Sequence, residues 1–276
     1  MSTHSLLFLS VLCALANCGC QAIPHDAAGE GQEPPPPVLA VPCVAAPPVI
    51  DGTLDDAAWA HAAIIPRLGP AHGGAGKDRI ARLPTTVRVA WDANCLYVAF
   101  ACMDDHIDAD PAAKHDSDLY RHDACELFLD PVGDGRQYLE FQISPLGQTL
   151  DLVYLLTAPP EYTAAGRLTD SFFAREVWFF REWEAAGLQV ASGRLRHDGA
   201  VTGWTVELAI PAAAIMKRRG LNSFVPGELR ANFARYDWQP DPGTGKRELL
   251  PMYWAPVAFG CPHISAGLMG RLVLKR

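Results

Sequence analysis

Most of the chain alternates apolar and polar residues with a period of two, and this pattern restricts the fold more than any other feature. The segments Thr86–Trp91 and Leu96–Ala101 flank a turn at Asp92–Asn94 and predict a hairpin. A second predicted hairpin joins Cys125–Asp130 to Tyr138–Ser144 through a glycine-containing turn. Because successive side chains of a strand point to opposite faces, each strand should send alternate residues into a core.

The remaining pattern extends this prediction over most of the chain. In the strand at Tyr138–Ser144, Leu139, Phe141 and Ile143 should enter the core, while Glu140, Gln142 and Ser144 take the other face. Further strands are expected at Thr149–Leu156, Leu188–Leu195, Trp204–Ala209, Leu229–Tyr236 and Leu268–Leu274. Helical signals are confined to Asp55–Ala60 and Pro211–Met216. Many strands with a few short helices indicate an all-β fold, an antiparallel β-sandwich of jelly-roll-like type.

Composition sets the broad class of the protein. Of the 276 residues, 49% are hydrophobic and 20% are charged, which is typical of a globular chain with a sizeable core. The net charge is -8, with 23 Lys and Arg against 31 Asp and Glu. Nucleic-acid affinity is built mainly from cationic contacts to phosphates, so the composition predicts no nucleic-acid partner.

The N-terminal residues have the pattern of an export signal. Leu6–Ala16 is apolar and uncharged, too short to cross a bilayer, and ends near two cysteines. Residues 1–20 are therefore predicted to be a signal peptide that exports the protein to the periplasm or cell surface. The sequence before Cys18 resembles a lipoprotein lipobox, and Cys20 is a second candidate for lipid attachment, so an N-terminal lipid anchor is an alternative to simple secretion.

A tether and one folded domain are expected after the signal. Residues 21–40 contain a run of four prolines among Gly, Ala and acidic residues, which favours an extended, Pro-rich tether. Residues 41–276 show no second linker and no internal repeat, and we interpret them as one domain.

The cysteines of this domain leave their pairing open. Five cysteines lie after the signal, so at least one is unpaired. A disulfide between Cys43 and Cys261 would join the two ends of the domain. We interpret Cys95, Cys102 and Cys125 as small buried hydrophobic residues.

Five sequence motifs, in the same order, resemble family 9 carbohydrate-binding modules. The motifs are Val49–Trp59 (VIDGTLDDAAW), Val87–Asp105 (VRVAWDANCLYVAFACMDD), Tyr120–Pro131 (YRHDACELFLDP), Gly203–Pro211 (GWTVELAIP), and Tyr253–Trp254 followed by Gly270–Leu274 (GRLVL). The resemblance implies a β-sandwich that binds sugars, often with calcium in a structural role.

The resemblance also assigns site residues. Tyr120 and Trp254 would clamp a sugar between two aromatic rings, with Tyr120 in place of the usual Trp. Glu126 would accept hydrogen bonds from sugar hydroxyls, and Gln142 and Arg235 would complete the carbohydrate-binding set. Flat aromatic surface with convergent hydrogen-bonding groups suits a sugar ring, which has apolar faces and polar edges.

The sequence is also compatible with structural roles for these residues. Tyr120 and Trp254 are also compatible with ordinary core packing. Glu126 is also compatible with a buried ion pair to Arg121 or Arg235.

Acidic residues suggest a metal site. The segment 103–110 places Asp104, Asp105 and Asp108 close together, and His115–Asp118 adds further oxygen ligands of the kind that calcium prefers. These three aspartates are the predicted calcium ligands. The alternative is a solvated acidic loop, and the spacing of the nearby histidines follows no usual zinc-ligand pattern.

These features predict an exported, non-catalytic module that binds a mono-, oligo- or polysaccharide and supports polysaccharide capture or breakdown, with a glycoside hydrolase as a partner. One alternative is a glycoside-active hydrolase. Asp123, Glu126 and Asp130 lie on one short segment, however, which makes it hard to place two carboxylates on opposite sides of a bond. The other alternative is a haem-binding electron-transfer subunit of the same sandwich fold, for which Met103, Met252 and Met269 are available as axial ligands.

Overall fold

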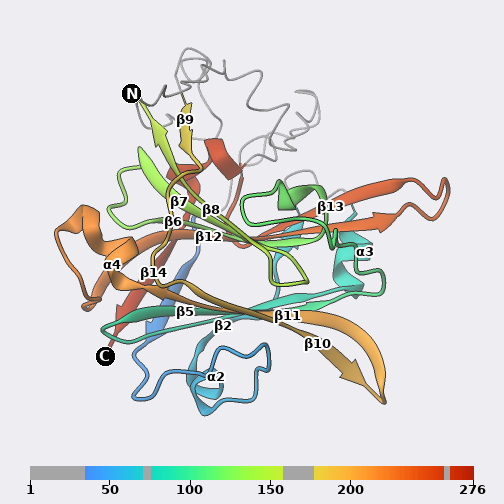
Figure 1. The fold of residues 1–276 in the computed structure, drawn as a ribbon, viewed down its shortest axis with the longest axis horizontal. Coiled ribbons are helices and arrows are strands. Elements are labelled where there is room, and N and C mark those ends of the chain that lie inside the picture. Colours follow the sequence, from blue (N-terminus) through green and yellow to red (C-terminus); the bar gives the residue numbers. More distant parts are fainter. Residues whose placement is uncertain (1–34, 71–75, 158–176, 258–261) are drawn as a thin grey trace.

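Two β-sheets pack face to face in the computed structural model of the protein (Figure 1). The structure describes residues 35–70, 76–157, 177–257 and 262–276. The predicted signal peptide, both lipidation candidates and residues 21–34 of the predicted tether lie outside the described residues. Among the described residues, every helix is too short or too polar to span a bilayer.

The larger sheet carries the strands that frame the candidate site. In spatial order its strands are β1 (Val38–Pro42), β14 (Gly270–Lys275), β12 (Gly227–Pro240), β6 (Ala124–Asp130), β7 (Gln137–Ile143), β8 (Thr149–Leu156) and β9 (Val177–Phe180). β13 (Arg247–Tyr253) pairs with β12, and β3 (Gly69–Pro70) pairs with β13. The pair β1–β14 is parallel, and the other pairs of the described sheet are antiparallel.

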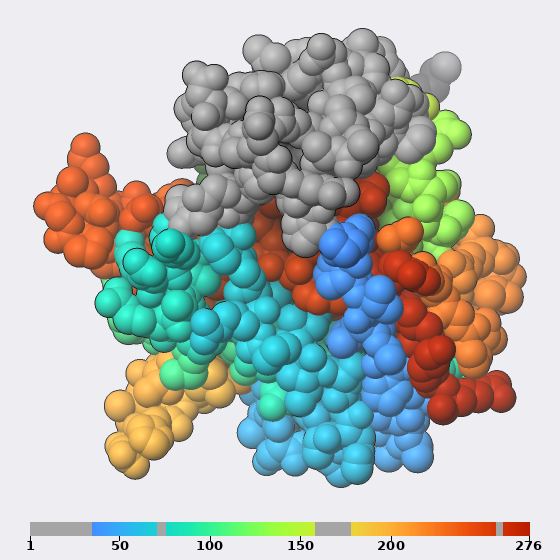
Figure 2. All heavy atoms as spheres, turned by 180° about the vertical axis from the view of Figure 1, so that it is seen from behind, coloured from blue at the N-terminus to red at the C-terminus, as the bar shows by residue number. Residues whose placement is uncertain are grey.

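The smaller sheet is antiparallel, and short helices lie around the sandwich. Its strands, in order, are β10 (Gln189–His197), β11 (Ala200–Pro211), β5 (Cys95–Met103), β4 (Thr85–Trp91) and β2 (Ala63–Ile65). The α-helices are α2 (Ala57–His61), α3 (Lys77–Arg82) and α4 (Ala212–Ile215), and the 3-10 helices are η2 (Leu119–Arg121), η4 (Met216–Arg219), η6 (Pro262–Ile264) and η7 (Ala266–Leu268). The β10–β11 and β12–β13 hairpins project from the body of the molecule (Figure 2).

The antiparallel-rich sandwich confirms the predicted fold class. β8 has the predicted bounds, and both predicted hairpins form as β4–β5 and β6–β7. Other strand ends shift by a few residues, and β2, β3, β9 and β13 form where no strand was predicted. At the N-terminal end of the fold, β1 begins at Val38, inside the predicted tether. Val38–Ala40 pair in register with Arg271–Val273 of β14, so strand pairing places the last residues of the predicted extended tether in the larger sheet.

The larger sheet is buried on both faces. Leu139, Phe141 and Ile143 of β7 enter the core between the sheets, as predicted. The outer face of the same sheet carries a second apolar cluster, built on residues such as Phe128 and Tyr138. The segments around η2, η6 and η7 contribute residues to this second cluster and cover the face.

A single carboxylate joins two of the five motifs. Glu207 on β11 accepts hydrogen bonds from the backbone N–H of Asp51 (3.0 Å) and Gly52 (2.6 Å) and from Trp59 Nε1 (2.6 Å). Gly52 has φ +91°, and a Cβ there would lie 2.7 Å from the backbone of Ser192. The opening motif therefore serves to attach the first loop and α2 to the smaller sheet.

Two of the cysteines meet between the sheets. Cys102 on β5 and Cys125 on β6 are fully buried, with their Sγ atoms 3.4 Å apart. Cys43 and Cys95 are free thiols as well. Because Cys43 is a free thiol, the Cys43–Cys261 disulfide considered from the sequence is not formed in this structure; Cys261 itself lies outside the described residues.

Candidate functional site

Polar side chains form a connected row on the outer face of β6 and β7. The backbone N–H of Tyr120 donates to Gln142 Oε1 (3.2 Å), and Gln142 Nε2 donates to Glu140 Oε1 (2.6 Å). His263 Nε2 lies 3.1 Å from Glu140 Oε2 and extends the row to η6. Glu126 stands directly opposite Gln142 in the β6–β7 register, so the strand pairing brings them together on this face.

Three of the predicted sugar-binding residues thus lie close together, but they are buried. Tyr120 is 7% exposed, Gln142 is 4% exposed and Glu126 is 1% exposed. Tyr120 packs in the outer apolar cluster, which matches the core-packing alternative. Contact of these three side chains with a sugar stays a prediction.

Trp254 does not face Tyr120. Tyr253 pairs with Ala234 and belongs to the outer cluster with Tyr120, so the next side chain points to the opposite face. The Trp254 ring packs against Phe233 of the inter-sheet core, with ring centroids 5.5 Å apart. The expected aromatic clamp is therefore not formed between these two rings.

Arg235 also lies on the inner face, away from Gln142. Its guanidinium is fully buried and lies 2.9 Å from Asp104 Oδ2 and 3.3 Å from Asp237 Oδ1. Asp123 joins these two aspartates, with oxygens within 4.8 Å of one another. Burial, followed by the charge of Asp104, raises the pKa of Asp123 to about 9. The group is thus a buried ion cluster in which one carboxyl keeps its proton at neutral pH.

The three predicted calcium ligands do not converge. Asp104 is held in the buried cluster by Arg235, while Asp105 is exposed. Asp108 instead faces His122, at 3.1 Å, and Arg247. A hard cation needs several oxygens around one point, and these side chains point to different partners. The set does not fit a calcium ion, and calcium binding by this chain stays a prediction.

A pocket of about 420 Å³ opens beside the polar row. It lies where η2 and the preceding loop meet the end of β7, on the same outer face as Gln142. Its lining residues are Asp110, Ala113, Asp116, Ser117, Asp118, Leu119, Arg121, His122, Ser144, Gln148 and Arg181. The volume lies within the range of roughly 300 to 1,000 Å³ that is usual for small-molecule sites.

Charged groups of both signs meet in this pocket. Asp118 Oδ1 accepts from Arg181 Nη2 (2.5 Å), and Asp118 Oδ2 accepts from Arg121 Nε (3.2 Å). Partial burial raises the pKa of Asp118, but the two guanidinium groups lower it more, so the net pKa lies below its ordinary value. Asp118 is therefore ionised at neutral pH, and donors and acceptors stand side by side on the pocket wall.

The structure adds functional candidates that the sequence did not single out. Arg181 follows β9 and reaches the pocket from a distant part of the sequence. Ser144 Oγ donates to Gln148 Oε1 (2.5 Å), and both residues line the pocket. Asp118 was visible as part of the acidic segment His115–Asp118, but its spacing suggested metal ligation and not a pocket.

Comparison with known proteins supports the sequence resemblance. Residues 50–144 match the family model described as carbohydrate family 9 binding domain-like. This match runs from the opening motif through β7 and includes η2. The domain is CBM9-like, that is, like a family 9 carbohydrate-binding module. No curated protein sequence matches the chain.

Solved structures share the fold of this CBM9-like domain. A CBM9 from Caldicellulosiruptor kristjanssonii in complex with cellotriose has 17% identity and a TM-score of 0.55, over 86% of this chain and 93% of that chain. A CBM9 from the same organism in complex with glucose has 17% identity and a TM-score of 0.54, over 86% of this chain and 95% of that chain. A protein from Bacteroides uniformis ATCC 8492 has 15% identity and a TM-score of 0.57, over 87% and 100%. At these identities the likeness shows a shared fold.

Proposed function

We propose that the CBM9-like domain binds a carbohydrate in the pocket beside Tyr120. The observation that carries the proposal is the wall formed by Asp118, Arg121 and Arg181, where acceptors and donors stand side by side in a pocket of about 420 Å³. A sugar hydroxyl both donates and accepts, so it can bridge a carboxylate and a guanidinium. The solved relatives with cellotriose and glucose support this class of ligand.

The apolar part of the pocket is small. Leu119 and Ala113 line it, and the ring of Tyr120 lies next to it, with Arg121 stacked over the ring at 5.4 Å. We infer that recognition depends more on charge-assisted hydrogen bonds than on an aromatic clamp. Such bonds contribute roughly 1.5 to 3 kcal/mol each when one partner is charged.

Calorimetric titration of the full chain with glucose and cellotriose tests the proposal, and a glycan array extends it to other sugars. Asp118→Asn keeps side-chain size while removing a negative charge, and Arg121→Gln removes the guanidinium charge and leaves a shorter polar side chain. Each should weaken binding about tenfold or more, which corresponds to about 1.4 kcal/mol per tenfold. Arg196→Gln is the matched control, because Arg196 is exposed on β10 and hydrogen-bonds only locally, to the Gly199 carbonyl.

Two results would contradict the pocket assignment. One is unchanged affinity in both variants for a sugar that the parent binds. The other is an absence of binding to every sugar on the array. Melting temperatures of the variants are measured alongside, so that loss of fold is distinguished from loss of ligand contacts.

We further propose that binding is non-catalytic and serves polysaccharide capture or breakdown outside the cytoplasm, with a glycoside hydrolase as partner. Incubation with cellotriose should leave the sugar intact, and release of glucose would contradict the non-catalytic role. The apolar segment Leu6–Ala16 supports export to the periplasm or cell surface.

Membrane attachment is the remaining part of the proposal. Cys18 and Cys20 support a lipid anchor followed by an extended Pro-rich tether. The full-length protein should partition with membranes when expressed in a bacterial host, and the double variant Cys18→Ser, Cys20→Ser should be released. Equal partitioning of the two proteins would contradict the proposed lipid anchor.

A further inference from the structure

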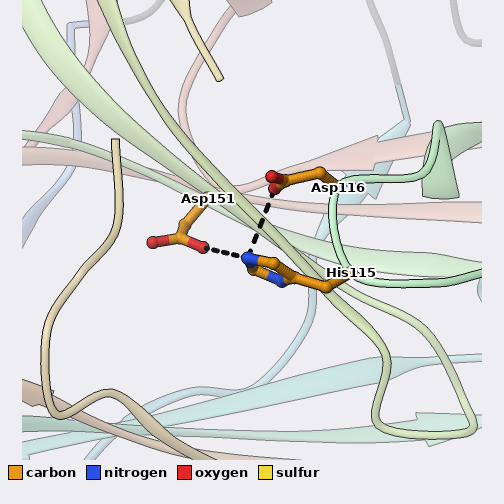
Figure 3. A group of neighbouring side chains, drawn as sticks. All are labelled: His115, Asp116 and Asp151. Atoms are coloured by element: carbon orange, nitrogen blue, oxygen red, sulfur yellow. Dashed lines mark ion pairs between the residues drawn. The ribbon is translucent and has the colours of Figure 1, made fainter. Parts of the chain in front are cut away.

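A histidine and three carboxylates converge where the loop before η2 meets the start of β8. Figure 3 shows the His115 ring pointing between the carboxylates of Asp116 and Asp151. His115 Nε2 lies 3.5 Å from Asp116 Oδ1, 3.7 Å from Asp151 Oδ1 and 3.0 Å from Glu184 Oε1. The ligand atoms of the first three residues all lie within 4.8 Å of one another.

Hydrogen bonds to neighbouring residues fix the His115 ring and the Asp151 carboxylate. His115 Nδ1 is 3.1 Å from the Thr149 carbonyl and 2.9 Å from Thr149 Oγ1, which orients the ring and leaves Nε2 facing the group. The side chain of Asp151 is only 2% exposed, and its Oδ2 accepts from the backbone N–H of Ala185 (2.6 Å). Metal-ligating histidines are characteristically fixed through the other ring nitrogen in this way.

Two oxygens that face His115 have no hydrogen bond in the structure. Asp116 Oδ1 is a buried atom without a partner. Asp151 Oδ1, from the almost fully buried side chain, has His115 Nε2 at 3.7 Å, beyond hydrogen-bonding distance. A histidinium bound to Glu184 alone would leave both oxygens unsatisfied, whereas a cation between them would contact each directly. Asp116 Oδ1 is a buried acceptor without a hydrogen bond, which is costly, so this oxygen in particular needs a partner.

The three distances from His115 Nε2 are close to those between the ligand atoms of a tetrahedral zinc site. Zinc binds imidazole nitrogen and carboxylate oxygen at about 2.0 to 2.2 Å, so the ligand atoms of a tetrahedral site are separated by roughly 3.3 to 3.6 Å. The distances of 3.0, 3.5 and 3.7 Å from Nε2 lie around this value. We propose that His115, Asp116 and Asp151 bind a zinc-like divalent transition metal, with Glu184 as a fourth ligand.

Glu184 suits the role of an adjustable ligand. Its side chain is 60% exposed and now accepts from His115 Nε2, so it can turn to the metal when Nε2 gives its lone pair to the ion. Metal binding at pH 7 then requires neutral His115 and ionised carboxylates. An imidazole ligand favours zinc, copper or nickel over calcium, which prefers oxygen alone. The proposal of this metal site does not rest on the proposed carbohydrate binding.

Titration of the metal-freed full chain with zinc chloride tests the proposal. Zinc should raise the melting temperature of the parent, because a ligand that binds the folded state alone stabilises it. His115→Gln should weaken zinc affinity by about tenfold or more in calorimetry. Asp151→Asn should likewise weaken zinc affinity. Cobalt(II), used as a spectroscopic probe, should give the absorption of a tetrahedral site in the parent but not in His115→Gln.

His197→Gln is the matched control, because His197 is 83% exposed on the projecting β10–β11 hairpin and should leave zinc binding unchanged. Zinc affinity that is the same in His115→Gln and the parent would overturn the site. An absence of zinc binding would also overturn the site. The same holds if calcium, and not zinc, stabilises the parent and Asp151→Asn removes that stabilisation. Since His115 is 44% exposed, its Gln variant should fold, and circular dichroism checks this.

Discussion

At the residue scale, one step along the chain decides whether Tyr253 or Trp254 faces the outer surface of the sheet. The motif pointed to the Tyr253–Trp254 pair, but adjacent strand residues point to opposite faces. Which of the two faces outward depends on pairing with β12, a contact far away in the sequence. The sequence therefore predicts the segment but not the direction of the ring.

Replacement of Trp254 by Ala should reduce the free energy of unfolding by about 3 kcal/mol, because it leaves a cavity against Phe233. Sugar affinity should stay unchanged. Urea denaturation and calorimetry measure the two effects. Native stability with lost sugar affinity would contradict the inner-core placement and restore the predicted clamp.

The same ring makes Gly270 sensitive to substitution. A Cβ at Gly270 would lie 2.4 Å from the Trp254 ring, so Gly270→Ala should destabilise the parent. In a Trp254→Ala background the cost should shrink, because the ring is absent. A double-mutant cycle in urea measures this coupling, and equal costs in both backgrounds would contradict the contact.

Asp123 gives the protein a specific pH dependence. Its pKa is near 9 in the folded state against 3.8 for the ordinary group. Between these values the folded state holds a proton that the unfolded state releases, so its contribution to stability is present at low pH and falls as pH rises through this window. The slope approaches about 1.4 kcal/mol per pH unit for one fully retained proton.

Asp123→Asn should flatten this pH dependence, since the amide does not titrate. Urea denaturation of both proteins from pH 5 to pH 8.5 measures the difference between the two slopes. Identical slopes would show that the cluster around Arg235 leaves Asp123 ionised.

At the element scale, alternation predicted β4 to β8, β10 to β12 and β14, which bury one face in the inter-sheet core. It did not predict β2, β3, β9 and β13, nor β1, where pairing with β14 recruits Val38–Ala40 from the predicted Pro-rich tether. It also could not predict that the outer face of β6 and β7 is covered. The covering segments around η2 and η6 reach that face through contacts between residues far apart in the chain, such as His263 with Glu140. For this reason Glu126 and Gln142 were expected at a surface and lie in the interior.

Glu207 should be a main source of stability for the opening segment. It accepts three N–H groups, from Asp51, Gly52 and Trp59. In Glu207→Gln, the amide group must face at least one of these donors, and the unfolding free energy should fall by about 2 to 3 kcal/mol. Glu228→Gln is the control, because Glu228 is 37% exposed in a surface pair with Arg271 and should change stability by under about 1 kcal/mol. Equal effects of the two variants on urea denaturation would contradict the anchoring role.

At the scale of the whole molecule, the sandwich supports loops on the outer face of its larger sheet. The five motifs resembled a carbohydrate-binding family, and the match over residues 50–144 agrees with that resemblance. The motif residues nonetheless lie mostly in the interior. The pocket is lined by residues from the loop before β6, the end of β7 and the segment after β9. Loops carry binding groups while the sheets fix their positions.

Hydrogen–deuterium exchange of the full chain, with and without saturating cellotriose, tests the central claim most directly. Binding in the pocket should slow exchange in residues 113–122 and 144–148, because the ligand covers these backbone segments and restricts their opening. Exchange in the projecting β10–β11 hairpin should stay unchanged. Protection confined to other segments, or no protection at sugar concentrations that saturate the protein, would contradict the account.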